Sequence, residues 1–121
     1  MLIVDDDPEI RRVLSDILRD AGYEVRTATD AEHAFRSAVA LAPDLILLDV
    51  YVPEPSFALR FAQNYRDRLP AEERAPIIAL SGVSDIEKLS QQLGASGFIR
   101  KPFEVDELLR VLDKWLTAGA G

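Results

Sequence analysis

Residues 45–49 read Leu-Ile-Leu-Leu-Asp, an apolar run that ends on a carboxylate. Two other apolar runs also end on a polar residue: residues 2–5 read Leu-Ile-Val-Asp, and residues 77–81 read Ile-Ile-Ala-Leu-Ser. An apolar run without polar alternation is typical of a strand that is covered on both faces, as in the middle of a parallel sheet. These stretches therefore predict a buried parallel sheet with a polar side chain at the end of each strand.

Two further runs and five helical patterns complete the chain. The additional runs are Tyr23–Thr27 and Gly97–Ile99. Apolar residues recur at helical spacing in stretches that begin near Ile10, Ala31, Ala58, Ile86 and Val105. Five strand–helix units in a row favour an α/β sheet with right-handed crossovers and helices on both faces.

The starts of two helices carry capping signals. Asp7 can cap the first helix, and Pro8 suits its first turn, where no amide donor is needed. Thr29 is followed three residues later by Glu32, which is the spacing of a capping box. The second helix is therefore predicted to begin directly after Thr29.

The composition excludes several classes of protein. The 121 residues suffice for one domain with its own core. The absence of cysteine excludes disulfides and thiolate metal sites and fits a reducing compartment, so we expect a cytoplasmic location. A net charge of −7 without a basic stripe argues against direct binding of nucleic acid. No apolar run approaches the roughly 20 residues of a membrane span, so no membrane association is expected.

Polar residues gather where the predicted strands end. They are, in chain order, Asp5, Asp6, Asp7, Asp49, Ser81 and Lys101. Because ligands of open α/β sheets bind at the carboxyl ends of the strands, we expect these side chains to share one crevice. Clustered carboxylates need a cation between them, and oxygen ligands suit Mg²⁺. A carboxylate can also act as a nucleophile and form an aspartyl phosphate, whose charge Mg²⁺, Lys101 and Ser81 would neutralise.

Four motifs in this order resemble the receiver domains of two-component response regulators. They are Val4-Asp5-Asp6-Asp7-Pro8, Leu47-Leu48-Asp49-Val50, Ala79-Leu80-Ser81-Gly82 and Gly97-Phe98-Ile99-Arg100-Lys101-Pro102-Phe103. The resemblance runs from Leu2 to about Leu116. It implies a CheY-like receiver domain over residues 1–117, with a flexible tail or the start of a linker over 118–121. The implied fold is a flavodoxin-like (βα)5 three-layer sandwich with a parallel sheet of strand order 2-1-3-4-5.

The resemblance also implies a role for each site residue. Asp49 would be the phosphoacceptor. Asp6 and Asp49 would bind Mg²⁺ through their carboxylates, with the backbone carbonyl of Tyr51 as a third ligand and Asp5 acting mostly through water. Lys101 would contact the phosphoryl oxygens and would precede Pro102 in a cis peptide bond.

A switch and a set of partners follow from the same resemblance. Ser81 would be the hydroxyl that moves toward the phosphoryl group, and Phe98 the aromatic that then turns inward. The donor would be a phosphohistidine on a sensor histidine kinase or a histidine phosphotransfer protein, and the recipient a downstream effector protein or a fused output domain. A homodimer through the fourth and fifth helices is an open alternative to a monomer. The chain would not be an enzyme in the usual sense but would promote its own phosphorylation and dephosphorylation.

The sequence departs from the family pattern after the acceptor. Phe57 stands eight residues after Asp49, where family members usually carry Gly, and Pro55 is an additional proline. The loop is therefore predicted to be reshaped, with Phe57 exposed or facing a partner. The bulky Tyr51 and the apolar Val83 are predicted to slow self-hydrolysis of the phosphorylated form.

Two other functions are weighed against this one. A pseudo-receiver that binds partners without phosphorylation would lack the acceptor, a metal-binding acid or the lysine, and all of these are present. A phosphatase of the haloacid-dehalogenase type needs a second Asp two residues after the nucleophile, and that position is Tyr51. His33, the single histidine, is predicted to be a solvated helix residue rather than a phosphohistidine donor.

Overall fold

The structure is a computed structural model that describes residues 1–5, 7–50, 56–82 and 86–120, with side chains up to residue 116. The strands are β1 (Leu2–Val4), β2 (Arg26–Ala28), β3 (Ile46–Asp49), β4 (Ile77–Ser81) and β5 (Gly97–Arg100). The helices are α1 (Pro8–Asp20), α2 (Ala31–Leu41), α3 (Ser56–Arg68), α4 (Ile86–Leu93) and α5 (Val105–Ala120), with a short 3-10 helix η1 (Ala71–Glu73).

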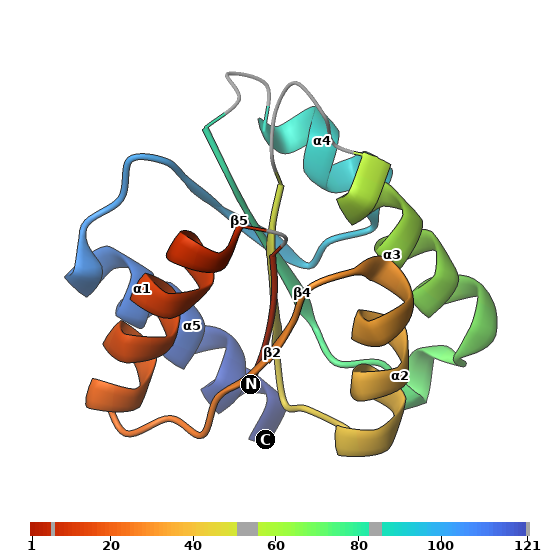
Figure 1. The fold of residues 1–121 in the computed structure, drawn as a ribbon, viewed down its shortest axis with the longest axis horizontal. Coiled ribbons are helices and arrows are strands. Elements are labelled where there is room, and N and C mark those ends of the chain that lie inside the picture. The colour runs from red at the N-terminus through yellow and green to blue at the C-terminus, as the bar shows by residue number, and fades with distance from the viewer. Residues whose placement is uncertain (6, 51–55, 83–85, 121) are drawn as a thin grey trace.

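All five strands run parallel in one sheet of order β2-β1-β3-β4-β5 (Figure 1). This order confirms the predicted fold class. It places β3 in the centre, with β1 on one side and β4 on the other, while β2 and β5 form the edges. The carboxyl end of β3, where Asp49 lies, is therefore flanked by the ends of two neighbouring strands.

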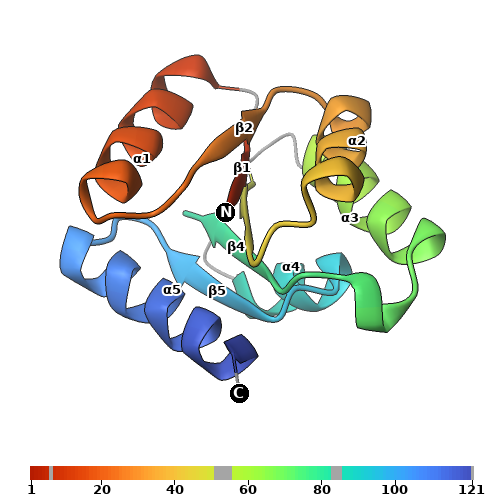
Figure 2. The ribbon, with the colours of Figure 1, turned by 90° about the horizontal axis from the view of Figure 1, so that it is seen from below.

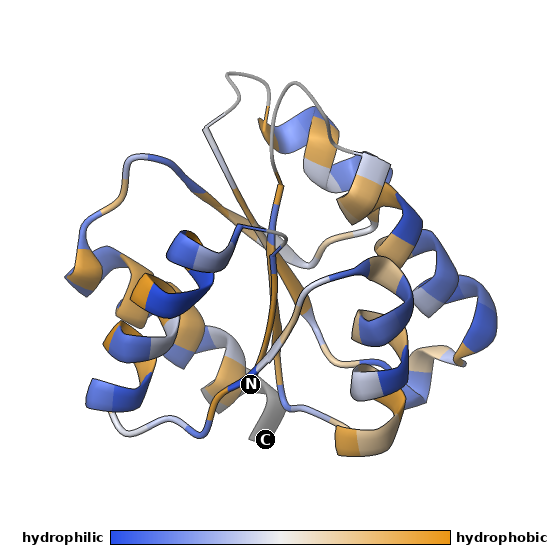
Figure 3. Cartoon of the chain, viewed as in Figure 1, coloured by the Kyte–Doolittle hydropathy of each residue, from blue (hydrophilic) through white to orange (hydrophobic). Residues whose placement is uncertain are grey.

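Helices cover both faces of the sheet. Figures 1 and 2 show α1 and α5 on one face and α2, α3 and α4 on the other. The three inner strands, β1, β3 and β4, contribute side chains to both cores: Ile3 and Leu47 pack with α1 and α5, whereas Val4 and Leu48 pack with the other helices. This double burial explains why the strands lack polar alternation. Figure 3 shows the result, with hydrophobic strands in the middle and hydrophilic residues on the outer sides of the helices.

The helix starts confirm one capping prediction and correct another. Asp7 caps α1 and accepts a hydrogen bond from the Glu9 N–H at 2.9 Å, as predicted. The prediction for Thr29 was wrong, because Asp30 caps α2 and accepts from the His33 N–H at 2.8 Å. Asp30 has extended backbone directly before the first helical residue, which brings its carboxylate to that N–H, whereas Thr29 is one residue too early.

The second strand begins later than the sequence pattern predicts. The predicted run started at Tyr23, but β2 starts at Arg26. The Tyr23 N–H donates to the Leu18 carbonyl at 3.0 Å, and Tyr23 and Val25 pack with the core below α1. Their apolar character therefore reflects a buried connection rather than a strand.

The last helix continues to Ala120, so the backbone of residues 118–120 is helical where a tail was predicted. The division between a domain over 1–117 and a tail stays a prediction.

Across the part of the chain that the structure describes, none of the helices combines the length and apolarity needed to cross a bilayer.

Candidate functional site

The structure brings four of the predicted site residues together at the carboxyl ends of the strands. Asp49 ends β3 and Ser81 ends β4, while Asp5 and Lys101 directly follow β1 and β5. Because β3 pairs with both β1 and β4, and β4 pairs with β5, these strand ends are neighbours. The Lys101 N–H donates to the Ser81 carbonyl at 2.8 Å, which ties the last two ends together.

Asp49 forms the closest polar contact of the site. Its Oδ1 accepts a hydrogen bond from the Lys101 Nζ at 2.6 Å, across 52 residues of sequence. The side chain of Asp49 is 4% exposed and that of Lys101 29%. A buried carboxylate needs such a partner, because burial without compensation is costly. The pair therefore keeps a buried carboxylate at the end of β3 with a cation beside it.

Asp5 lies beside Asp49 and is equally buried. Its Oδ1 accepts from the Asp7 N–H at 2.9 Å, whereas its Oδ2 is buried and has no hydrogen-bond partner. The pKa of Asp5 is raised from 3.8 to about 8, chiefly by burial and further by the neighbouring Asp49 carboxylate. The hydrogen bond from the Asp7 N–H and the charge of Lys101 lower this pKa, but by less. Two carboxylates this close in a buried site compete for protons unless a cation joins them.

Arg11, on α1, contacts the backbone that carries Asp5. The Arg11 Nη1 donates to the backbone carbonyl of Asp5 at 3.0 Å. Together with the capping contact of Asp7, this bond fixes the backbone on which Asp5 is carried. Arg11 was not among the residues predicted from the sequence; the signal that could have identified it is an arginine one turn after an acidic cluster.

The predicted switch residues occupy different environments. Ser81 is fully buried at the end of β4. Phe98, on β5, has an exposed fraction of 36%, so it is turned outward rather than inward. The peptide bond between Lys101 and Pro102 is cis, as the resemblance implied.

The donor set suits a hard cation. Asp5 offers a buried carboxylate oxygen without a partner, and Asp49 offers a second carboxylate beside it, which are oxygen ligands of the kind that Mg²⁺ prefers. Within the described ranges no three Asp, Glu, His or Cys side chains come together as a metal cluster. Two predicted ligands, Asp6 and Tyr51, lie outside the described residues, as does Val83.

The predicted exposure of Phe57 was wrong, whereas a contact of Phe57 with a partner stays a prediction. Phe57 lies in the first turn of α3, is half-buried, and packs against the core that α2, α3 and α4 share. The helix begins one residue earlier, at Ser56, so its first turn already points an apolar side chain toward the sheet. An aromatic at this position therefore extends the core.

A largely apolar groove adjoins the site. Its volume is about 680 Å³, and it lies between α1 and the segment after β5. Ile10 and Val13 line it from α1, and Lys101, Pro102 and Phe103 line it from the other side. Val13 is 47% exposed, so the groove is open to solvent.

Comparison with known proteins agrees with this geometry. Residues 1–113 match the response regulator receiver domain. The chain is 34% identical over 119 residues to the nitrogen assimilation regulatory protein NtrX of Azorhizobium caulinodans, which covers 96% of this chain and 26% of NtrX. It is 36% identical over 111 residues to the DNA-binding dual master transcriptional regulator RpaA of Synechocystis, which covers 90% of this chain and 45% of RpaA. The chain thus spans about a quarter to a half of the length of these relatives.

Solved structures show the same fold. The chemotaxis protein CheY4 of Vibrio cholerae superposes with a TM-score of 0.79 at 34% identity, over 93% of this chain and 94% of CheY4. The receiver domain of the sensor histidine kinase PA1611 of Pseudomonas aeruginosa, which has a magnesium ion coordinated in its active site cleft, gives a TM-score of 0.81 at 31% identity, over 96% of this chain and 95% of that one. The chain therefore belongs to the family of response regulator receiver domains.

Proposed function

We propose that Asp49 accepts a phosphoryl group from a phosphohistidine in a magnesium-dependent reaction. The observation that carries this proposal is the buried Asp49 carboxylate, held by the Lys101 Nζ at 2.6 Å beside the unpartnered Asp5 Oδ2. Phosphoryl transfer to a carboxylate requires a nucleophilic oxygen, a cation beside it and a further oxygen that can bind Mg²⁺.

In the proposed reaction, an Asp49 oxygen attacks phosphorus as the bond between phosphorus and the donor imidazole nitrogen breaks. The imidazole leaves and the product is an acyl phosphate. The Lys101 ammonium neutralises charge on the phosphoryl oxygens, and burial strengthens that interaction. Asp5 and Asp49, with Asp6 and the Tyr51 carbonyl, would hold Mg²⁺, which when bound supplies positive charge to the same oxygens.

The proposed donor is a sensor histidine kinase or a phosphotransfer protein. The groove lined by Ile10, Val13 and Phe103 supports docking there, because it is largely apolar and open and Lys101 also lines it. A partner seated on it would bring a histidine to the site and exclude water from it.

The output is proposed to be a change of surface. Ser81 would move toward the phosphoryl group, and the outward Phe98 would then turn inward and alter the face made by α4, β5 and α5. That face would bind a downstream effector or a fused output domain, or form a homodimer through α4 and α5. We further propose that Tyr51 and Val83 slow self-dephosphorylation, and that the protein acts in the cytoplasm.

The test is phosphorylation by acetyl phosphate with Mg²⁺, followed by intact mass. A gain of about 80 Da, one phosphoryl group, is expected for the native chain and not for Asp49→Asn or in EDTA. If no gain occurs, beryllofluoride with Mg²⁺ is titrated as a phosphoryl mimic and monitored by NMR. Absence of both the mass gain and the mimic's shifts would contradict the proposal and favour a pseudo-receiver.

A further inference from the structure

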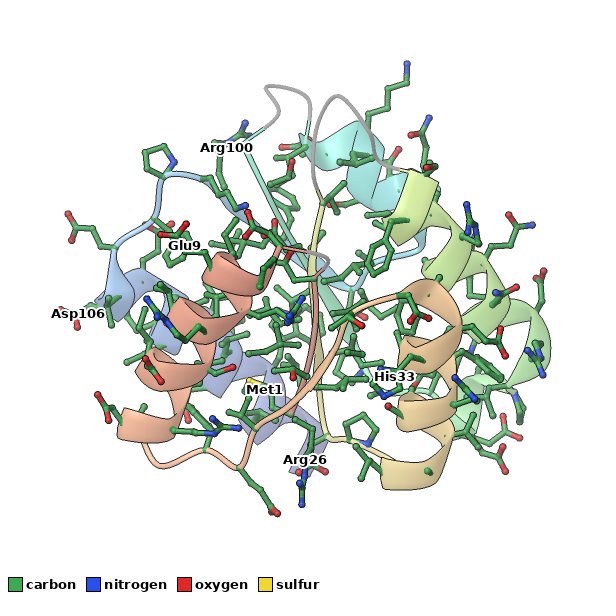
Figure 4. The ribbon with its side chains drawn as sticks, in the orientation of Figure 1. Met1, Glu9, Arg26, His33, Arg100 and Asp106 are labelled. Carbon is green, nitrogen blue, oxygen red and sulfur yellow. The ribbon has the colours of Figure 1, made fainter. Side chains whose placement is uncertain are left out.

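A second charged region lies along the open edge of the sheet, at β2. A groove of about 690 Å³ runs there between β2, α2 and the end of α1. Among the described residues, its lining includes Arg19, Arg26, His33 and Arg36 and contains no carboxylate. Figure 4 shows His33 reaching from α2 toward β2, with Arg26 far from Glu9 and Arg100 at the other end of the sheet.

The arginines of this groove are not neutralised within the described part of the chain. None of the three forms an ion pair with another residue that the structure describes. Arg26 and Arg36 are exposed, and Arg19 donates from its Nη2 to the Val25 carbonyl at 3.1 Å. On a protein of net charge −7, an unneutralised basic groove creates a local positive potential against an acidic background.

The groove also contains the free edge of β2. The Arg26 N–H donates to the Met1 carbonyl at 3.0 Å, and the Ala28 carbonyl accepts from the Asp5 N–H at 3.2 Å, so both residues bond toward β1. In a parallel ladder the residue between them turns its backbone groups the other way, and Thr27 therefore directs its N–H and C=O to the open side. Such an edge can pair with an extended chain.

We propose that this groove binds an extended acidic polypeptide segment of a partner protein, which pairs with the edge of β2 and places carboxylates against Arg26 and Arg36. Ala28 packs with the core on the α2 side, and Arg26, two residues earlier, shares that face. The partner's acidic residues therefore occupy alternate positions that face α2, and Leu41, 46% exposed at the groove, gives an apolar contact.

A polypeptide fits better than a nucleic acid for two reasons. Only a polypeptide can use the N–H and C=O of Thr27 as strand partners. The surrounding acidic surface repels a polyanion of high charge density, whereas a short acidic segment meets mainly the groove. No residue of this surface belongs to the Asp49 site, so the proposal does not depend on phosphorylation.

The test is an NMR titration with an N-acetylated peptide of alternating glutamate and valine. We expect saturable shifts of the Val25, Thr27 and Arg36 amides, which weaken as salt is raised. Affinity is expected to fall about tenfold or more in the double variant Arg26→Glu with Arg36→Glu. The matched double variant Arg60→Glu with Arg110→Glu, at exposed arginines of α3 and α5, keeps the affinity within about twofold.

The proposal is overturned by any of three results. The first is no saturable shift up to about 1 mM peptide. The second is equal affinity in the two double variants, and the third is binding of a single-stranded oligodeoxynucleotide without binding of the peptide. Both double variants are expected to keep the dispersed amide spectrum of the native chain, which shows that they fold whether or not Asp49 is phosphorylated and so separates this proposal from the one about Asp49.

Discussion

The two charged regions of this chain hold their charges in opposite ways. At the carboxyl end of the sheet, Asp49 and Asp5 are buried, and the Lys101 Nζ contacts one Asp49 oxygen directly. At the β2 edge, Arg26 and Arg36 are exposed and share an open groove. Buried charges interact strongly and shift their neighbours' pKa, whereas exposed charges interact weakly and are screened by salt. The first region suits chemistry on one atom, and the second suits recognition over an area.

The largest expected effect comes from removing the lysine of the buried site. Lys101→Met takes away the ammonium at 2.6 Å from Asp49, and the rate of phosphorylation by acetyl phosphate is expected to fall about 100-fold. Lys114→Met, at an exposed lysine of α5, is the control and keeps the rate. Time courses of intact mass measure both. A Lys101→Met rate close to that of the native chain would mean that the pair only supports the fold.

The next effect concerns proton binding by Asp5. Its pKa is about 8 in the folded chain and 3.8 ordinarily, so between these values the folded state keeps a proton that the unfolded state releases. Stability without metal therefore falls as pH rises through this window. Asp5→Asn is expected to remove this dependence of stability on pH. It should also raise Tm near pH 8, by about 4 °C for each kcal/mol by which the free energy of unfolding increases.

Mg²⁺ is expected to oppose the loss of stability that the native chain shows as pH rises. Because the cation competes with the proton, Mg²⁺ should raise Tm more near pH 8 than near pH 6. Thermal unfolding in EDTA and in Mg²⁺ measures both effects, with Asp16→Asn, at an exposed position of α1, as the control. A stability of the native chain that rises with pH in EDTA would contradict the assignment of Asp5.

A smaller effect, on Mg²⁺ affinity, is expected from Arg11, which bonds to the Asp5 carbonyl. Arg11→Gln removes the bond to the Asp5 carbonyl, and Mg²⁺ affinity is expected to fall about tenfold, as when an outer-shell partner is lost. Its neighbour Arg12 is exposed, and Arg12→Gln should leave the affinity unchanged. Titration of Mg²⁺ against Tm compares the two variants. Equal affinities would show that the loop keeps its shape without Arg11.

The smallest effect lies near the β2 groove, in the backbone. Ala42 ends α2 with φ of +44°, a left-handed conformation that favours glycine. Ala42→Gly is expected to stabilise the chain by about 0.5–1 kcal/mol, whereas Ala40→Gly, inside the same helix, should destabilise it by about 1 kcal/mol. Urea unfolding measures both. If Ala42→Gly were as destabilising as Ala40→Gly, the helix would not end as described.

Periodicity along the chain identified all five strands and all five helices, and the boundaries were its weak point. β2 was expected from Tyr23 and begins at Arg26, because a buried connection and a strand are both apolar. The cap of α2 was expected one residue early, since Thr29 and Asp30 are both suitable capping residues. Phe57 was expected to face outward, but its burial depends on how α3 packs against α2 and α4.

What the sequence by itself determined is the strand–helix alternation and the chemistry available at the strand ends: carboxylates, a hydroxyl and one lysine. The strand order came from resemblance rather than periodicity. Only the tertiary structure decided that the Lys101 Nζ meets Asp49, that Asp5 keeps an unpartnered oxygen, and that Arg19, Arg26 and Arg36 share one groove. The physical reason is that local patterns depend on which face of a single element is buried. Contacts between elements depend instead on how the strands are ordered and how the helices pack on them, which no local pattern encodes.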